Sequence, residues 1–145
     1  MICVAEGKDL KRLTEFLTSA GLGTDGLSEE KMDSFLLLEG PGGRLTGSLG
    51  MEVFEQFGLL RSLVVSAGQG QKEIFLLFDQ MMQLAKKKGV RELYLATNRQ
   101  ESLPFFNLLG FAQTSREDLP SEFYQSEHIQ HILNVDNSLF LKFTL

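Results

Sequence analysis

Residues 59–89, LLRSLVVSAGQGQKEIFLLFDQMMQLAKKKG, decide the fold of this chain. The apolar run Leu59 to Val65 is typical of a buried strand, and it enters a glycine-bearing loop, Ser66 to Gln71. A long amphipathic helix follows. Because a loop that opens a helix presents unpaired backbone N–H groups at the positive end of the helix dipole, this arrangement favours a phosphate-bearing ligand.

The helix is predicted over Lys72 to Lys88 and has one apolar face. Three lysines and Gly89 end it, as the helix dipole and the geometry of a C-terminal cap favour. A second strand is expected at Glu92 to Thr97, followed by a short helix that closes on residues 107–111, NLLGF. The apolar face of the long helix consists of Ile74, Leu77, Phe78, Met81, Leu84 and Ala85.

The flanking segments extend this pattern on both sides. The first half is expected to contain a strand, a helix, an irregular segment and a hairpin closed by Glu39 to Gly43, and the chain ends on an alternating strand. This order predicts an α/β fold with a mixed sheet and helices on both faces. The segments are Met1 to Ala5, Lys8 to Ala20, Gly21 to Asp33 with a short helix near Ser28 to Met32, Ser34 to Leu38, Arg44 to Val53 and Ser138 to Leu145.

The totals fit one globular domain over residues 1–145, with 43% hydrophobic and 23% charged residues. The net charge of -5 argues against nucleic acid and against an anionic membrane surface as partners. The single cysteine, Cys3, cannot form an internal disulfide, and no apolar run reaches the roughly 18 residues of a membrane span. We therefore expect a cytoplasmic protein without a membrane segment.

Four stretches together resemble the GNAT acyltransferase superfamily. They are residues 60–66, LRSLVVS, the Gln-Gly-rich loop after them, residues 89–97, GVRELYLAT, and residues 105–111, FFNLLGF. Within the superfamily the chain looks most like the arsenic-resistance-associated and N-acetylglutamate-synthase-like branch, through Gly50-Met51-Glu52 and Asp118-Leu119-Pro120. The resemblance covers nearly the whole chain.

The resemblance implies a GNAT-like fold, with a mixed, mostly antiparallel sheet of about six to seven strands. It also implies direct transfer of an acetyl group from acetyl-CoA to a small amine, without a covalent enzyme intermediate. In the family the pantetheine arm lies where the central strand and the next strand splay apart, which corresponds here to Leu63, Val64 and Val65. The family's pyrophosphate loop corresponds to Gln69, Gly70, Gln71, Lys72, Glu73 and Ile74.

This loop departs from the family pattern, because Lys72 and Ile74 occupy positions that are small in the family. An alternative register makes Gly68 and Gly70 the phosphate-facing residues. The departure motivates a second hypothesis, a degenerate GNAT-fold module with weak or no coenzyme A binding and a regulatory or interaction role. A third reading is an unrelated nucleotide-binding α/β domain.

Acyl transfer to an amine needs a base, a group that polarises the thioester carbonyl and a proton source for the thiolate. A backbone N–H near Val64 or Val65 is the polariser that the resemblance implies. Glu52 is the candidate base or ammonium-binding carboxylate, with an exposed strand carboxylate as the alternative. Where the family often has a proton-donating tyrosine, this chain has Phe106, which is expected to pack or to line the cofactor.

The remaining candidates have two interpretations each. Arg61 could bind an acidic group or form a partly buried salt bridge, and alternation predicts that it shares a face with Leu63 and Val65. Through the resemblance, Asn98 corresponds to a cofactor-contacting position of the superfamily, and its alternative is a helix cap or turn residue. His128 and His131 have a spacing that metal sites use, but a third ligand is missing, so no metal is predicted.

We expect the acceptor pocket to be built by Gly21 to Asp33, Gly50 to Gly58 and the segment after Phe111. Strand edges in such sheets could pair between subunits, which would make a homodimer.

Overall fold

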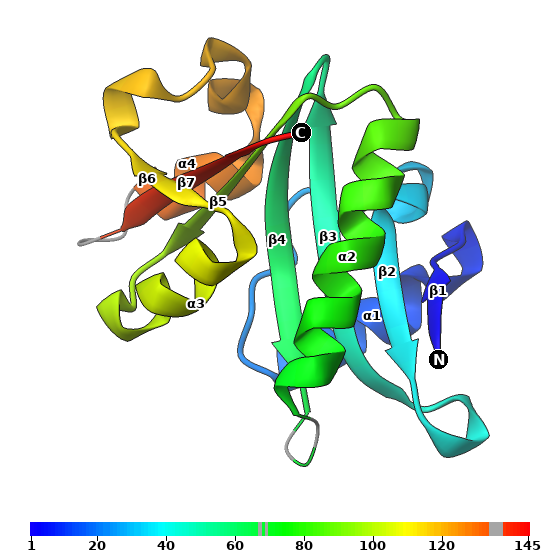
Figure 1. The fold of residues 1–145 in the computed structure, drawn as a ribbon. Coiled ribbons are helices and arrows are strands. Elements are labelled where there is room, and N and C mark those ends of the chain that lie inside the picture. The colour runs from blue at the N-terminus through cyan, green and yellow to red at the C-terminus, as the bar shows by residue number, and fades with distance from the viewer. Residues whose placement is uncertain (67, 69, 134–137) are drawn as a thin grey trace.

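The computed structural model describes residues 1–66, 68, 70–133 and 138–145. Its centre is a seven-stranded sheet in the order β1-β2-β3-β4-β5-β7-β6 (Figure 1). All neighbouring strands are antiparallel except β4 and β5, which are parallel. This confirms the predicted mixed, mostly antiparallel sheet. The strands are β1 Ile2–Val4, β2 Phe35–Glu39, β3 Leu45–Phe54, β4 Phe57–Val65, β5 Glu92–Thr97, β6 Ala112–Thr114 and β7 Leu139–Thr144.

Helices cover both faces of the sheet, as the sequence predicts (Figure 1). The helices α2 and α3 pack on one face, and α1 and α4 pack on the other. The α-helices are α1 Leu10–Ser19, α2 Gln71–Lys87, α3 Leu103–Leu109 and α4 Glu127–Leu133. Short 3-10 turns connect them: η1 Gly7–Asp9, η2 Glu29–Ser34, η3 Pro41–Gly43, η4 Gln100–Ser102, η5 Arg116–Asp118 and η6 Ser121–Gln125.

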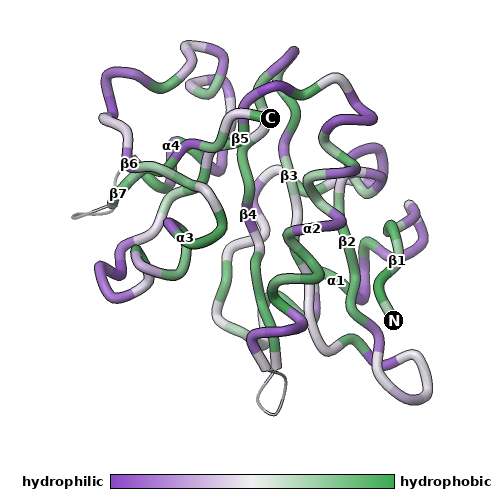
Figure 2. The backbone as a smooth tube through the Cα atoms, in the orientation of Figure 1, coloured by the Kyte–Doolittle hydropathy of each residue, from purple (hydrophilic) through white to green (hydrophobic). Residues whose placement is uncertain are grey.

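Strand alternation explains why both faces of the sheet are apolar. In β2, Leu36 and Leu38 pack under α2, whereas Phe35 and Leu37 pack under α1. Because helices cover both faces, hydrophobic residues follow one another without alternation in β2, FLLL, and in the stretches of β4 on either side of Arg61 and Ser62. Figure 2 shows hydrophobic colour along much of the strands, whereas hydrophilic colour lies on the helices and in the connections. None of the described helices is long and apolar enough to cross a membrane.

A bulge in β4 corrects one prediction from the sequence. The pairing with β3 shifts between Ser48 and Gly50, and Ser62 there has a positive φ of 59°. Past the bulge, Leu63 and Val65 pack on the α2 face, while the Arg61 side chain lies on the opposite face with Glu52. The prediction that Arg61, Leu63 and Val65 share one face is therefore wrong, because one extra residue inverts the alternation.

Candidate active site

The strands β4 and β5 separate soon after they meet. Their parallel pairing covers only Phe57 to Leu59 on β4, opposite Glu92 to Tyr94 on β5. Both strands continue beyond that point, β4 to Val65 and β5 to Thr97, and they diverge toward the lower edge of the sheet in Figure 1. Although β4 is the central strand, its residues from Ser62 to Val65 are only half-buried. One side of this part of β4 is therefore without a partner strand among the described residues.

The hydrogen bonds to β3 show which backbone groups face this side. Ser66 N–H donates to Thr46 O at 2.8 Å, and Val65 lies opposite Gly47. Antiparallel pairs alternate between hydrogen-bonded and non-hydrogen-bonded residues, so the N–H and C=O of Val65 point away from β3. They point toward the side on which β5 has diverged. Of the two amides named from the sequence, Val65 thus faces this side and Val64 faces β3.

The first turn of α2 lies directly after this end of β4. Gly70 caps the helix, and its N–H donates to Glu73 Oε2 at 2.8 Å. Lys72 is exposed, whereas Ile74 is half-buried and packs against the core on the α2 face. Ile74 is thus turned toward the core. The Glu73 carboxylate accepts a hydrogen bond from the Gly70 N–H, which is one of the amides predicted to bind phosphate. Gln69 lies outside the described residues, so its predicted cofactor contact is not described.

Asn98 and Phe106 differ in their surroundings. Asn98 is exposed and follows the last residue of β5. Because β4 and β5 are parallel, both strands finish at the same end of the sheet, so Asn98 lies at the same end as the first turn of α2. Phe106 is buried in α3 among the rings of Phe78, Phe105 and Phe111, so its packing interpretation agrees with the structure. Its role at the cofactor stays a prediction.

Glu52 and Arg61 form a buried ion pair on the other face of the sheet. Arg61 Nη1 lies 3.0 Å from Glu52 Oε1, and the side chains are 1% and 6% exposed. Ser126 Oγ donates to both carboxylate oxygens, at 3.1 Å and 2.9 Å, and accepts the N–H of Ile129 at 3.1 Å. Burial lowers the pKa of Arg61, while the charge of Glu52 opposes this shift. The alternative of an exposed strand carboxylate at Glu52 is therefore wrong.

The salt-bridge interpretation of Arg61 is confirmed, and Ser126 is a partner that the sequence analysis did not identify. Its signal was present: a serine directly before a segment with apolar residues at helical spacing is typical of an N-terminal cap.

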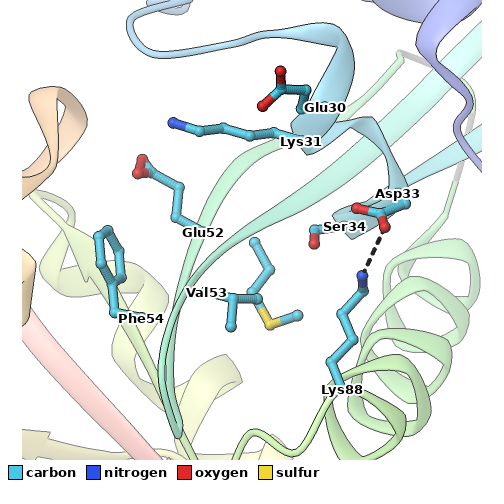
Figure 3. A pocket seen from close by; sticks show the side chains of 9 residues that line it. Glu30, Lys31, Asp33, Ser34, Glu52, Val53, Phe54 and Lys88 are labelled. Carbon is cyan, nitrogen blue, oxygen red and sulfur yellow. Dashed lines mark ion pairs between the residues drawn. The ribbon is translucent and has the colours of Figure 1, made fainter.

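A pocket of about 430 Å³ adjoins this ion pair (Figure 3). Glu52 lines it from β3, with its carboxylate turned away from the Asp33–Lys88 ion pair, which closes another side at 3.2 Å. Two of the three segments predicted to build an acceptor pocket thus lie side by side here. The lining residues are Glu30, Lys31, Asp33 and Ser34 of η2, Met51, Glu52, Val53 and Phe54 of β3, and Lys88 after α2.

His128 on α4 is held in the neutral form. Burial lowers its pKa to about 3, and the positive charge of Arg61 and the neighbouring His131 add to the shift. Within the described ranges, no group of three or more His, Cys, Asp or Glu side chains is arranged to hold a metal ion.

Comparison with known proteins gives one relative in sequence and several in structure. No protein-family model matches the chain. The uncharacterized protein YwlB of Bacillus subtilis is 33% identical over 140 residues, which cover 96% of this chain and 93% of YwlB. This identity over nearly the full length shows that the two chains belong to one family.

The solved structures are more distant in sequence and similar in fold. N-acetylglutamate synthase from Neisseria gonorrhoeae, complexed with coenzyme A and N-acetyl-glutamate, matches all of this chain with a TM-score of 0.78 and 21% identity. This chain spans only 35% of that enzyme.

Two further structures match along almost their whole length. Rv2747 from Mycobacterium tuberculosis, in complex with coenzyme A and the ligand NLQ, has a TM-score of 0.76 and 18% identity, and the match covers 100% of this chain and 99% of that one. A GNAT-family acetyltransferase from Staphylococcus aureus Mu50 has a TM-score of 0.74 and 19% identity, with 100% and 98% covered. The chain thus belongs to the family of Bacillus subtilis YwlB and has the fold of the GNAT-family acetyltransferases.

Proposed function

We propose that this protein is an acyl-CoA-dependent N-acetyltransferase that transfers an acetyl group from acetyl-CoA directly to a small amine. The proposal rests mainly on one observation, the separation of β4 and β5 beyond Leu59 and Tyr94. The coenzyme A complexes of two proteins with this fold support it.

The residues present fit a pantetheine arm along β4. An extended chain that carries amide groups can pair with a strand edge through main-chain hydrogen bonds. Val65 offers one N–H and one C=O on the side without a partner strand, beside the half-buried Leu63 and Val64. The first turn of α2 and Asn98 lie at the same edge of the sheet, where the diphosphate would be held by Gly70, Gln71, Lys72 and the neighbouring amides of the loop.

Acetyl-CoA, when bound, supplies an acetyl thioester. The amine must be neutral to attack it, so its ammonium form loses a proton, a C–N bond forms, the C–S bond breaks and a proton reaches the thiolate. A backbone N–H of β4 would stabilise the developing oxyanion. Phe106 has no proton to give, so solvent or another group would protonate the thiolate.

We assign the acceptor amine to the pocket beside Glu52. Three carboxylates line this pocket, Glu30, Asp33 and Glu52, and they suit a positively charged ammonium group. Lys31 and Lys88 also line the pocket and partly balance this negative charge. Because both carboxylate oxygens of Glu52 already accept hydrogen bonds, we assign Glu52 the task of attracting and orienting the ammonium group ahead of the task of removing its proton. Cytoplasmic location and a homodimer remain predictions.

A second candidate, a degenerate GNAT-fold module with weak or no coenzyme A binding, is favoured by the contact between Glu73 and Gly70 N–H. For a diphosphate to reach that amide, the carboxylate has to move away. In this alternative the domain would serve a regulatory or interaction role.

Isothermal titration with coenzyme A, acetyl-CoA and ATP separates the hypotheses. We expect binding of both coenzyme A forms and none of ATP. Absence of binding at millimolar coenzyme A would favour the module, and binding of ATP alone would favour an unrelated nucleotide site.

A pair of variants tests the role of the strand. Val65→Pro removes the N–H that faces away from β3 without removing a bond to β3, so we expect coenzyme A to bind about tenfold more weakly, the value of one good hydrogen bond. Val65→Ala keeps the N–H and is the matched control. Equal affinity in both variants would contradict the pairing, provided that both melt near the wild-type temperature.

A further inference from the structure

The segment from Gly21 to Ser28 crosses the face of the sheet that carries Glu52. It connects α1 to η2 without regular structure, and all of its residues from Gly21 to Asp25 except Thr24 are exposed. Its local backbone bonds lie mainly at its two ends: Gly21 N–H donates to Thr18 O and Leu22 N–H to Leu17 O, and Ser28 O accepts from Lys31 N–H. Between them, Leu27 N–H donates to Thr24 O at 3.3 Å. Such a segment needs contacts from outside to keep one position.

Arg61 supplies these contacts from beneath the loop. Its Nη1 donates to Asp25 O at 2.6 Å, and its Nη2 lies 3.5 Å from Gly23 O. The same guanidinium donates from Nη1 to Glu52 Oε1 at 3.0 Å and from Nε to Ser62 Oγ at 3.2 Å. One buried side chain thus joins the loop to β3 and to the bulge of β4.

The chemistry of the contacts requires arginine. A guanidinium carries five N–H donors in a rigid fork, whereas a lysine ammonium is a single point on a flexible stem and cannot reach two loop carbonyls, a carboxylate and a hydroxyl at once. The acceptors in the loop are backbone carbonyls, so the contacts fix the position of the loop and leave its side chains free for other tasks. Glu52 balances the positive charge, which makes burial of Arg61 tolerable.

The location of Arg61 links the two halves of the proposed reaction. It precedes Ser62, the bulged residue after which the Leu63 and Val65 side chains pack on the α2 face and the Val65 N–H points away from β3. Its guanidinium lies on the opposite face, against the loop and against Glu52 of the acceptor pocket. A displacement of the loop would therefore act on the acceptor pocket through η2, which lines part of it, while leaving the strand edge that would bind coenzyme A in place.

We propose that Arg61 is a positioning residue for the amine substrate. It holds the Gly23 to Asp25 segment, which leads into the pocket-lining residues of η2, and it holds Glu52, which lines the same pocket from β3. This inference rests on the proposed function in its reference to the amine. It predicts that weakening the Arg61 contacts releases the loop, raises the KM for the amine and leaves coenzyme A affinity nearly unchanged.

The test combines backbone order and kinetics in the Arg61→Lys variant, which keeps the charge opposite Glu52. By ¹⁵N relaxation, we expect the order parameters of residues 23–26 to fall from about 0.85 to below about 0.6. L-glutamate, benzylamine and spermidine are the probe amines, and the kinetics use whichever of them the wild type acetylates. The KM for that amine should rise about tenfold, while kcat and the Kd of coenzyme A should stay within about twofold of the wild-type values. The reason is that releasing the loop removes contacts that bind the amine and leaves the contacts made only in the transition state.

The matched control is Arg12→Lys. Arg12 also joins carboxylates, Asp9 and Glu39, to a loop carbonyl, Gly43 O at 3.1 Å, but it lies at the other end of the sheet. This variant should loosen the turn at Gly43 and leave residues 23–26 ordered. If Arg61→Lys does not fold, Glu52→Gln replaces it in the test. This variant removes the charge that holds the Arg61 guanidinium, so the order parameters of residues 23–26 should again fall.

Unchanged order at residues 23–26 in a folded variant would overturn the inference. So would a fall in kcat or in coenzyme A affinity that matches the rise in KM, because that would indicate general damage. If the wild type neither binds coenzyme A nor acetylates a probe, the proposed function fails and the statement about the amine fails with it. The order parameters would still decide separately whether Arg61 holds the loop.

Discussion

The buried pair of Glu52 and Arg61 allows a quantitative prediction of stability. Replacing one partner alone leaves the other charge inside the protein, since the side chains are only 6% and 1% exposed. Breaking such a pair costs about 3–5 kcal/mol of unfolding free energy. For a chain of 145 residues, each kcal/mol corresponds to roughly 3 °C, so Glu52→Gln and Arg61→Met should each lower the Tm by about 10 °C or more.

The double variant should be damaged less than the sum of the two single variants. With both charges removed, no uncompensated charge stays buried, and the coupling free energy should be about 2 kcal/mol or larger. Urea denaturation followed by circular dichroism measures all four proteins of the cycle. Lys8→Met, which breaks the exposed pair between Lys8 and Glu6 at 3.2 Å, is the control and should change stability by less than about 0.5 kcal/mol.

The prediction would be wrong if the losses of unfolding free energy in the two single variants simply added up in the double variant, or if each single loss were below about 1 kcal/mol. Either result would mean that water reaches the carboxylate and that Glu52 is a solvated group. The cycle therefore also bears on catalysis, because a solvated carboxylate would be the stronger candidate for the base.

Three further predictions follow from single contacts. Gly50→Ala places a methyl carbon 2.1 Å from the Phe35 ring, so calorimetry should show a loss of about 1–3 kcal/mol. His128 has a pKa of about 3 in the folded state, against 6.5 in the unfolded chain, so as the pH falls between these values the unfolded chain takes up the proton first. The free energy of unfolding should therefore drop by up to about 1.4 kcal/mol per pH unit because of this group. His128→Gln should flatten this pH dependence in urea denaturation measured from about pH 7 to about pH 4. Glu73→Ala frees Gly70 N–H and removes a negative charge, so titration should show coenzyme A binding about two- to tenfold tighter.

Each of these has a control and a contradicting result. Gly23→Ala adds the same methyl group where the nearest atom is 3.8 Å away, and equal losses in both glycine variants would contradict the packing argument. His131→Gln, one turn further along α4, should retain the pH slope; an unchanged slope in His128→Gln would contradict the assignment. Unchanged or weaker coenzyme A binding in Glu73→Ala, with Glu101→Ala as the control, would show that no diphosphate lies at this amide.

Local signals predicted most secondary structure. The strand β5 has the predicted bounds, and α2 ends at Lys87, one residue before the predicted end, because a lysine-rich last turn followed by glycine is a strong stop signal. The hairpin of β2 and β3 also formed as predicted from its glycine-rich turn. Short elements without periodicity were missed, such as β6, which is defined by its pairing with β7.

The candidate site depended on contacts that a sequence does not display. The inversion of faces at Ser62 comes from a bulge in pairing with β3, and the residues around it show no local sign of one. The capping of Gly70 by Glu73 is local and could have been read from a glutamate at the third helical position. The bond from Ser126 to Glu52 spans 74 residues, so only the folded chain reveals it.

A crystal structure with coenzyme A bound would show whether the gap between β4 and β5 is the cofactor site. We expect the pantetheine arm between these strands, with an amide paired to the N–H or C=O of Val65 and the diphosphate at the first turn of α2. Coenzyme A bound elsewhere, or β4 and β5 closed on each other with no ligand at saturating concentration, would contradict it.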